Sequence, residues 1–232
     1  MTRDRVLAWD GCVNVRDLGG LPLAGGGETQ FGVLVRADSI RGLTDRGWRA
    51  LLEYGVRSAI DLRADDELAA DPPGSAPIPV AHLPVAPSNL DWSSVRSGYV
   101  GLLENYRPQF ARVASAIARS DEAVVVHCQG GRDRTGVLVA LLLGLTGVEL
   151  DAIVADHVRS EESWAPYLDA WYAAAETEEE RARRQRVSAP AGRAIAEVLE
   201  HVDATFGGAS SYLTGGGASV EDLDRIVLRL RG

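Results

Sequence analysis

Residues 123–136 read Ala123-Val124-Val125-Val126-His127-Cys128-Gln129-Gly130-Gly131-Arg132-Asp133-Arg134-Thr135-Gly136. The first six form a largely β-branched run without polar alternation, which is typical of a strand buried on both faces. The run from Thr135 to Val148 is apolar on every side and predicts a central helix with little exposed surface. A buried strand that leads through small residues into a buried helix predicts an α/β fold with a ligand site where the strand ends.

The connection between this strand and helix has the composition of an oxyanion site. When a strand turns through small residues into a helix N-terminus, successive backbone N–H groups point inward and the helix dipole lies behind them. Gly130 and Gly131 let the loop wrap without side-chain interference. Arg134 can contact two oxygens of a tetrahedral anion in a planar, bidentate geometry that lysine cannot reproduce. The loop is therefore expected to bind a phosphoryl group.

Cys128 stands at the floor of this predicted loop, six positions before Arg134. A field that holds an anion also favours thiolate over thiol, so we expect Cys128 to be ionised at neutral pH and to face the phosphorus atom. Thr135 is expected to donate its hydroxyl to the thiolate. The alternative is a buried structural cysteine, which would require the glycines, Arg134 and Thr135 to surround it by chance.

These residues resemble the His-Cys-x5-Arg-Thr-Gly signature of the cysteine-dependent protein tyrosine phosphatases. A second segment, Asn14-Val15-Arg16-Asp17-Leu18-Gly19-Gly20, resembles the Asn-Phe-Arg-Asp-Leu-Gly-Gly motif of their bacterial tyrosine/serine phosphatase branch. The resemblance extends to residues 35–39, to residues 60–63 and to the glycine-rich turn before Ser219, so it covers most of the chain. The branch usually has Gly-Lys-Asp-Arg in the loop, and Arg132 keeps that charge but changes its hydrogen-bond geometry.

The resemblance implies a metal-independent phosphatase without a cofactor, which works through a phosphocysteine on Cys128. Arg134 and the loop amides would stabilise charge on the equatorial oxygens. The residues expected to contact the substrate are Gln129, Gly130, Gly131, Arg132, Thr135, Asp61 and Arg63. The expected substrate is a phosphotyrosine protein, with phosphoserine, phosphothreonine or a phosphoinositide left open, and the product is inorganic phosphate.

Protonation of the leaving oxygen requires a general acid, and three aspartates compete for that role. The resemblance favours Asp133, which lies inside the loop. Asp61 ends a predicted strand and, in a parallel sheet, would reach the same edge as Cys128. Asp91, beside Trp92, lies in the kind of loop where larger tyrosine phosphatases carry a mobile acid.

The first half of the chain alternates extended runs with helices. Thr44 and Gly55 delimit one predicted helix, as its N-cap and its left-handed C-terminal residue. Two more helices are expected around Tyr99 and after Pro108. Strands are expected at residues 13–16, 30–36, 57–62 and 79–84, and connections at residues 71–74 and 86–97. Together with the 123–128 strand, these elements predict a small, largely parallel sheet flanked by helices.

The second half of the chain is predicted to be helical. One helix carries the apolar stripe Leu150, Ile153, Val154, His157 and Val158, in which His157 is interpreted as a core histidine. Residues 161–187 predict a helical arm with a capping box at Thr177 and Glu180 and with the ion pairs Glu179–Arg183 and Glu180–Arg184. The arm is interpreted either as a lid over the active site or as a solvated helix pair. Residues 1–232 are expected to form a single domain.

The composition excludes several classes of protein. The 232 residues include 33 acidic and 24 basic ones, for a net charge of -9, and every basic residue is arginine. The absence of lysine excludes Schiff-base chemistry and the lysine-dependent nucleotide loop, and the acidic balance argues against a nucleic-acid partner. The longest apolar stretch, Val137 to Leu145, is shorter than the about 20 residues of a membrane span. We therefore expect no membrane span and a cytoplasmic location, with export by a non-classical route left open.

Two other functions are weighed against the phosphatase. A rhodanese-like sulfurtransferase also uses a loop cysteine, but Arg134-Thr135-Gly136 argues against it. A phosphate-binding pseudophosphatase would recognise phosphoproteins, but it needs no nucleophile at Cys128. The sequence shows no metal-ligand spacing, and it leaves the oligomeric state open. A reversible disulfide between Cys12 and Cys128, which would protect the nucleophile from overoxidation, is a further hypothesis.

Overall fold

The computed structural model describes residues 3–72, 74–88 and 92–232. Within them, five strands form one sheet in the order β1-β2-β5-β3-β4. The strands are β1 (Arg16–Asp17), β2 (Leu34–Ala37), β3 (Val56–Asp61), β4 (Val80–His82) and β5 (Ala123–His127). Neighbouring strands are parallel except for β1 and β2. The predicted small, largely parallel sheet is confirmed.

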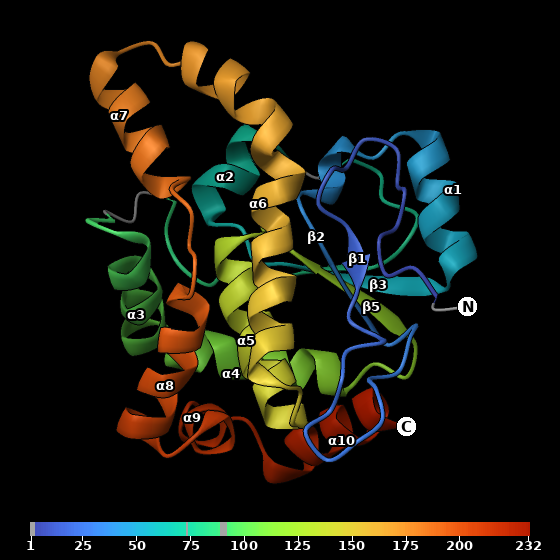
Figure 1. The fold of residues 1–232 in the computed structure, drawn as a ribbon. Helices are drawn as coiled ribbons and strands as arrows, with labels where there is room; N and C mark the ends of the chain where they lie inside the picture. Colours follow the sequence, from blue (N-terminus) through green and yellow to red (C-terminus); the bar gives the residue numbers. More distant parts are fainter. Residues whose placement is uncertain (1–2, 73, 89–91) are drawn as a thin grey trace.

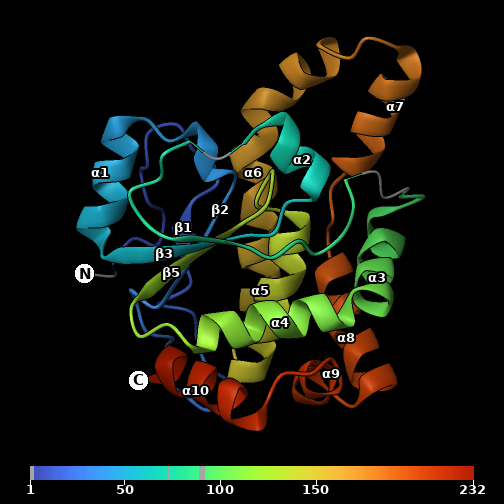
Figure 2. The same cartoon turned by 180° about the vertical axis from the view of Figure 1, so that it is seen from behind.

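Helices cover both faces of the sheet (Figures 1 and 2). They are the 3₁₀ helix η1 (Ile40–Gly42) and the α-helices α1 (Asp45–Tyr54), α2 (Asp65–Ala70), α3 (Val95–Asn105), α4 (Arg107–Ala118), α5 (Asp133–Thr146), α6 (Leu150–Ala173), α7 (Glu178–Val187), α8 (Ala194–Phe206), α9 (Ala209–Gly215) and α10 (Val220–Arg231). α1 lies on one face, and α4 and α5 lie on the other with α8, α9 and α10 packed around them. No helix in the described part of the chain is long and apolar enough to cross a membrane.

The apolar sequence of the central strand β5 follows from its position, because its residues pack into two hydrophobic cores. Val124 and Val126 belong to the larger core, under α4 and α5. Ala123 and Val125 belong to the smaller core, under α1. Successive side chains of a strand point to opposite faces, so the four residues of β5 that lie between the two cores are all apolar.

The helix before β3 is the one whose ends are predicted best. The Thr44 hydroxyl accepts a hydrogen bond from the Gly47 amide at 3.2 Å, and Gly55 is left-handed with φ of 104°. The predicted N-cap and C-terminal residue of α1 are both confirmed. Its C-terminal end leads directly into β3, which ends at Asp61 beside the end of β5.

The structure differs from the sequence prediction at α2, α3 and α6. The short helix α2 was not expected, and α3 begins at Val95, inside the connection expected at 86–97, because Ser94 caps it. The arm expected to begin at residue 161 is not a separate unit, because α6 runs without interruption through this position to Ala173. The second half of α6 and α7 extend beyond the rest of the protein as a hairpin (Figures 1 and 2).

The predicted ends and ion pairs of α7 are confirmed in part. The Thr177 hydroxyl accepts from the Glu180 amide at 3.0 Å, which is one half of the expected capping box. Glu180 pairs with Arg184 at 3.0 Å as predicted. Arg183 pairs with Glu180 at 3.8 Å rather than with Glu179, so that pair was assigned to the wrong glutamate.

Candidate active site

The loop between β5 and α5 has its carbonyl groups tied outward. The Gln129 carbonyl accepts from the Ser39 amide at 3.0 Å. The Gly130 carbonyl accepts from Asn14 Nδ2 at 2.9 Å and from Trp164 Nε1 at 2.8 Å. The Gly131 carbonyl accepts from the Arg36 guanidinium at 2.6 Å. Within the described residues, the amides of residues 129–132 donate to no protein acceptor, so they stay available for an anion.

Gly131 allows this loop to pack tightly against β2. Its φ is +64°, in the left-handed region, and a Cβ atom there would lie 2.3 Å from the Ala37 carbonyl oxygen. A side chain at this position would meet both a strained backbone and a rigid strand. A glycine is therefore required at position 131 by its backbone angle and by its close contact with β2.

Cys128 lies directly beyond the end of β5 and is 2% exposed. Thr135, in the first turn of α5, is also buried, and its hydroxyl has no hydrogen-bond partner in the described part of the chain. The predicted hydrogen bond from this hydroxyl to the sulfur is not formed here. A buried hydroxyl without a partner is costly, which favours any acceptor that reaches it. Thr135 therefore offers a free donor beside the loop.

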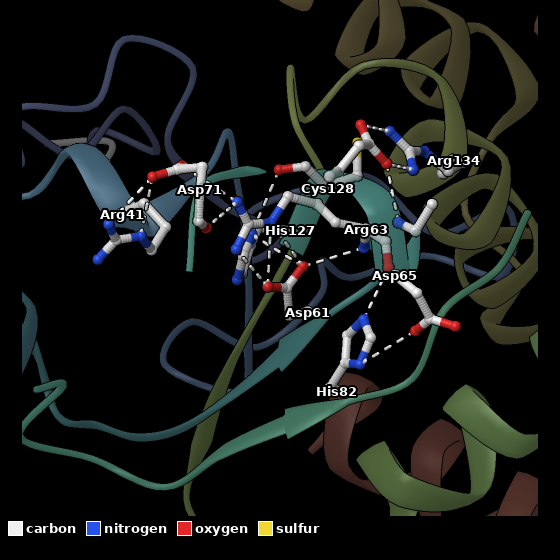
Figure 3. Close-up of polar contacts among 11 residues, drawn as sticks. Arg41, Asp61, Arg63, Asp65, Asp71, His82, His127, Cys128 and Arg134 are labelled. Carbon is white, nitrogen blue, oxygen red and sulfur yellow. Dashed lines mark hydrogen bonds and ion pairs between the residues drawn. The ribbon is translucent and has the colours of Figure 1, made fainter. Parts of the chain in front are cut away.

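Arg134 projects from the first turn of α5 (Figure 3). Its guanidinium is held by Glu67 of α2. Its two terminal nitrogens donate to the two carboxylate oxygens at 2.5 and 2.8 Å, and Glu67 also accepts from the Ala64 amide at 2.8 Å. Burial opposes the charge of Arg134, but the hydrogen bonds that it donates to Glu67 raise the pKa of Arg134. A guanidinium has five N–H donors, so Nε–H and one N–H on each terminal nitrogen remain for a ligand.

Asp61 and Arg63 lie at the end of β3, and their side chains are hydrogen-bonded to each other (Figure 3). Arg63 is fully buried, donates to both Asp61 oxygens, and also contacts Asp71 at 3.2 Å. Burial works against the Asp61 charge, yet the Arg63 hydrogen bonds hold the pKa of Asp61 below its usual value. In this structure Arg63 makes its side-chain hydrogen bonds to Asp61 and Asp71. The predicted substrate contacts of Asp61 and Arg63 stay predictions.

His127 lies behind the same pair and is fully buried. Its Nδ1 is 3.8 Å from the Asp61 carboxylate, and its Nε2 has no partner in the described part of the chain. Burial lowers the pKa of His127, which keeps the imidazole neutral. The surroundings of His127 are those of a structural histidine at the end of β5.

Arg132, which was predicted to bind the substrate, is committed to the arm instead. It is 7% exposed and donates to the carbonyls of Val187 and Ala189 at 3.2 and 2.5 Å. It also lies 3.5 Å from the Glu161 carboxylate of α6. Arg132 therefore joins the loop to the base of the α6–α7 hairpin. Its predicted contact with the substrate stays a prediction.

Of the two candidate acids that the structure describes, Asp133 has the more accessible carboxylate. It is the first residue of α5, its side chain is 32% exposed, and its Oδ1 accepts from the Tyr99 hydroxyl at 2.9 Å. The rival Asp61 is 2% exposed and locked to Arg63. Asp91 lies outside the described residues.

A buried carboxylate on α6 connects the Asn14 segment to the loop. Asp156 is 1% exposed and pairs with Arg5, with Arg16 at 2.9 Å and with Arg36 at 2.8 Å. Arg16 also donates to the Asn14 side chain at 2.6 Å. Because Asn14 and Arg36 hold loop carbonyls, Asp156 fixes the groups that shape the loop.

The remaining sequence hypotheses concern Asp17 and Cys12. Asp17 lies in the Asn14 segment, and it accepts from the amides of Gly19 and Gly32 and so stabilises the turn. Cys12 and Cys128 are both free thiols. Burial, with a smaller contribution from the Asp38 charge, raises the pKa of Cys12, which disfavours the thiolate needed for a disulfide with Cys128.

Sequence reasoning missed four residues that touch the loop or its charged groups: Glu67, Tyr99, Asp156 and Trp164. A signal existed for Glu67, because Asp65-Asp66-Glu67 is an acidic run that suits the first turn of a helix. A signal also existed for Asp156, which is adjacent to His157 on the inward side of α6. Nothing in the sequence pairs Tyr99 or Trp164 with the loop.

A parallel sheet that places a buried cysteine beneath unpartnered amides and beside a charged arginine is typical of cysteine-dependent phosphatases. The sequence profile described as "Tyrosine phosphatase family" matches residues 7–232, and the chain belongs to this family. Over 227 residues it is 30% identical to a tyrosine-protein phosphatase of Nostoc commune, covering 84% of this chain and 73% of that protein. The protein is therefore an enzyme, a protein-tyrosine phosphatase.

Two further proteins resemble this chain. The triple specificity protein phosphatase PtpB of Mycobacterium tuberculosis is 31% identical over 173 residues, which cover 57% of this chain and 62% of PtpB. The solved structure of TpbA from P. aeruginosa superposes with a TM-score of 0.33 at 18% identity, over 72% of this chain and 83% of TpbA. The family assignment comes from the profile and the Nostoc relative, and the TpbA superposition adds nothing to it.

Proposed function

We propose that this protein-tyrosine phosphatase hydrolyses phosphotyrosine in two steps, through a phosphocysteine on Cys128. The observation that carries the proposal is the outward attachment of three consecutive loop carbonyls, from Gln129 to Gly131. In a trans peptide the carbonyl of one residue points opposite to the amide of the next. Turning these three carbonyls outward therefore directs the amides of residues 130–132 to the inside of the loop, where they can donate to phosphoryl oxygens. Cys128 begins that loop and supplies the nucleophile.

In the first step, the Cys128 sulfur attacks phosphorus, an S–P bond forms, and the P–O bond to the tyrosyl oxygen breaks. Asp133 gives its proton to that oxygen, so the leaving group departs as a neutral phenol. In the second step, water attacks phosphorus and its proton passes to the Asp133 carboxylate. The S–P bond then breaks, and inorganic phosphate leaves with the thiolate restored.

The residues around Cys128 stabilise charge in both steps. Arg134 remains charged and, with Glu67 holding two of its N–H groups, directs the others toward the equatorial oxygens. Thr135 keeps an unpartnered hydroxyl that can donate to the sulfur when it is negative. These donors are fixed before the substrate arrives, which is what electrostatic stabilisation of a transition state requires.

We also propose that the α6–α7 hairpin is a lid for a phosphorylated protein substrate. Trp164 and Arg132 join the hairpin to the loop, so a movement of the arm would change the position of the loop residues that they contact. The Arg132 guanidinium, which could have recognised an additional phosphate of a phosphoinositide, is occupied by carbonyls near the end of α7. This favours a phosphoprotein over a phosphoinositide as the substrate class.

The direct test is phosphate release from a phosphotyrosine peptide in the presence of a chelator. Wild type is expected to release phosphate, and Cys128→Ser is expected to release none above background, because the serine hydroxyl is a far weaker nucleophile than a thiolate. Cys12→Ser is the matched control, since it removes the other cysteine and should keep wild-type turnover. Rapid acid quenching followed by mass analysis should find the phosphoryl group on Cys128.

Three results would contradict the proposal. Turnover by Cys128→Ser would exclude the phosphocysteine. Peptide binding without turnover by wild type would favour the pseudophosphatase. Thiocyanate production from thiosulfate and cyanide, without phosphate release, would favour the sulfurtransferase.

A further inference from the structure

Tyr99 is buried next to the candidate acid and bridges it to a histidine. It lies on α3, has no exposed surface, and its hydroxyl oxygen is 2.9 Å from Asp133 Oδ1 and 2.9 Å from His157 Nε2. Its ring is fixed between Trp92 and His157, each at a centroid distance of 5.5 Å and nearly perpendicular to it. Tyr99 therefore reaches the active site from α3, while His157 supports it from α6.

The protons of this chain can be assigned from its surroundings. Burial, followed by the charge of Asp133, raises the pKa of Tyr99, so the phenol keeps its proton. Burial, followed by the charges of Arg36 and Arg132, lowers the pKa of His157, so the imidazole is neutral. Two hydrogen bonds therefore share one phenolic proton and one imidazole proton.

Only one arrangement makes both bonds while Asp133 is a carboxylate. The Tyr99 hydroxyl must donate to Asp133 Oδ1, because a carboxylate has no proton to give. His157 must then carry its proton on Nε2 and donate it to the Tyr99 oxygen. This leaves Nδ1 of His157 as an unprotonated acceptor, consistent with its lack of a partner in the described part of the chain.

The same chain selects the oxygen that carries the catalytic proton. With Oδ1 occupied by the Tyr99 donor, a proton on Asp133 belongs on Oδ2, which accepts no hydrogen bond from the described residues. The Asp133 side chain is partly exposed, so Oδ2 is the oxygen open to a leaving group or to water. Without Tyr99, the carboxyl group could rotate and hold its proton on either oxygen.

We propose that Tyr99 is a positioning residue for the general acid, and that His157 holds the Tyr99 hydroxyl in the orientation that donates to Asp133. The inference rests on the proposed function, in which Asp133 protonates the leaving oxygen. Tyr99 keeps one face of the carboxyl group occupied, so that Oδ2 gives the proton in the first step and takes it back from water in the second. His157, interpreted from the sequence as a core histidine, thus supports catalysis through Tyr99.

The test compares Tyr99→Phe with wild type on aryl phosphates whose leaving groups differ in basicity. The measured quantity is kcat/KM, because it covers only the steps up to phosphocysteine formation. Phenyl phosphate has a basic, poor leaving group that needs a proton. For this substrate, Tyr99→Phe should lower kcat/KM roughly tenfold, which is a part of the about 10²–10⁴-fold that a positioned acid contributes. For 2,4-dinitrophenyl phosphate, whose leaving group departs as a phenolate without a proton, kcat/KM of Tyr99→Phe should stay near that of wild type.

Two further variants keep the test independent of folding. His157→Phe removes the donor to Tyr99 and should show the same dependence on the leaving group, to a smaller degree. Tyr212→Phe is the matched control, because Tyr212 is equally buried and its hydroxyl donates to the Leu103 carbonyl at 2.8 Å. Tyr212→Phe should not alter the ratio of kcat/KM between the two aryl phosphates. In an Asp133→Asn background, Tyr99→Phe should have no further effect on phenyl phosphate.

The outcomes separate this inference from the proposed function. If wild type hydrolyses neither aryl phosphate, the proposed function fails and the inference fails with it. If wild type is active but Tyr99→Phe lowers kcat/KM equally for both substrates, Tyr99 is only structural. An additive loss in the Asp133→Asn background would also overturn the inference, while leaving the phosphatase mechanism intact.

Discussion

Asp156→Asn should destabilise this protein more than its change of one atom suggests. The Asp156 carboxylate is the shared partner of Arg5, Arg16 and Arg36, whose side chains are 14%, 2% and 1% exposed. An asparagine has the same shape and can still accept from one guanidinium, but it removes the negative charge. Three largely buried cations would then face one another without a counter-charge.

The size of the effect follows from the burial of the pairs. Removing one partner of a buried ion pair costs about 3–5 kcal/mol, against a total stability of about 5–15 kcal/mol for a typical protein. At about 2–4 °C per kcal/mol for a chain of this length, Tm should fall by roughly 6–20 °C. Activity should fall as well, because Arg36 then holds the Gly131 carbonyl less firmly.

The same carboxylate predicts how stability depends on pH. Burial alone would raise the pKa of Asp156, but the charges of Arg16, Arg36 and Arg5 hold it far below its usual value. A depressed pKa contributes stability that is complete above the unfolded pKa of about 3.9 and is lost as pH falls below it. Asp156→Asn should therefore lose less stability than wild type when the pH is lowered through that range.

Thermal unfolding followed by circular dichroism, at neutral pH and at a series of acid pH values, measures both effects. Asp151→Asn is the matched control, because Asp151 lies on the same helix and its pair with Arg193 is exposed, at 89% and 63%. Exposed pairs contribute about 0–1 kcal/mol, so Tm of this control should hardly change. Equal Tm values for the Asp156 and Asp151 variants would refute the argument.

Three further variants test the loop and the arm. Glu67→Gln should lower kcat about ten- to hundredfold, because Arg134 loses a charge-assisted hydrogen bond worth about 1.5–3 kcal/mol; an unchanged kcat would show that Arg134 needs no such support. Gly131→Ala should abolish turnover of aryl phosphates, since its Cβ would displace the loop from Ala37; near-normal turnover would contradict the tight contact. Replacing residues 173–186 by a short Gly-Ser linker should change KM for a phosphopeptide and not for an aryl phosphate, and equal values for both would reject the lid.

Two of these variants have controls in the same chain. Glu197→Gln removes a carboxylate that pairs with Arg96 in an exposed position, at 44% and 63%, and it should leave kcat unchanged. Gly32→Ala changes another left-handed glycine, with φ of +76° and open space around its missing Cβ. It should cost about 1–2 kcal/mol of stability from backbone strain while activity is kept.

The sequence predicted the sheet and the loop because their signals are local. β5 needs an apolar residue at every position between two cores, and Gly131 is required by one backbone angle and one close contact. Cys128 and Arg134 are recognisable by their spacing alone. The prediction was weaker where a helix end depends on distant contacts, as in α6, which continues through residue 161.

The roles of the charged residues could not be predicted in the same way, because each depends on a partner from a distant segment. Arg63 is predicted to contact the substrate, and the fold pairs it with Asp61 and Asp71, two partners that the sequence does not reveal. Arg132 was assigned from its place in the loop, but it reaches carbonyls more than fifty positions later. A sequence shows that an arginine is near a site, whereas only the fold shows which acceptors reach it first.

α6 shows how a correct period can still identify the wrong residues. The predicted stripe included Leu150, which is 37% exposed, and omitted Asp156, which is buried beside His157. Apolar character was used to locate the inner face, but the inner face of this helix is polar where it meets the loop. Helices that support an active site must offer hydrogen-bond partners inward, so hydrophobic periodicity misplaces them at the positions that matter for function.

The pairing of buried charges explains how an acidic chain can hold an anionic substrate. Asp156 neutralises Arg16 and Arg36, and Glu67 partly neutralises Arg134. The positive charge near the loop is therefore largely cancelled, and long-range attraction contributes little to binding. In the proposed mechanism, selectivity for a phosphoryl group comes instead from short-range donors, namely the loop amides and the remaining N–H groups of Arg134. These donors are effective only in the geometry that the surrounding ion pairs impose.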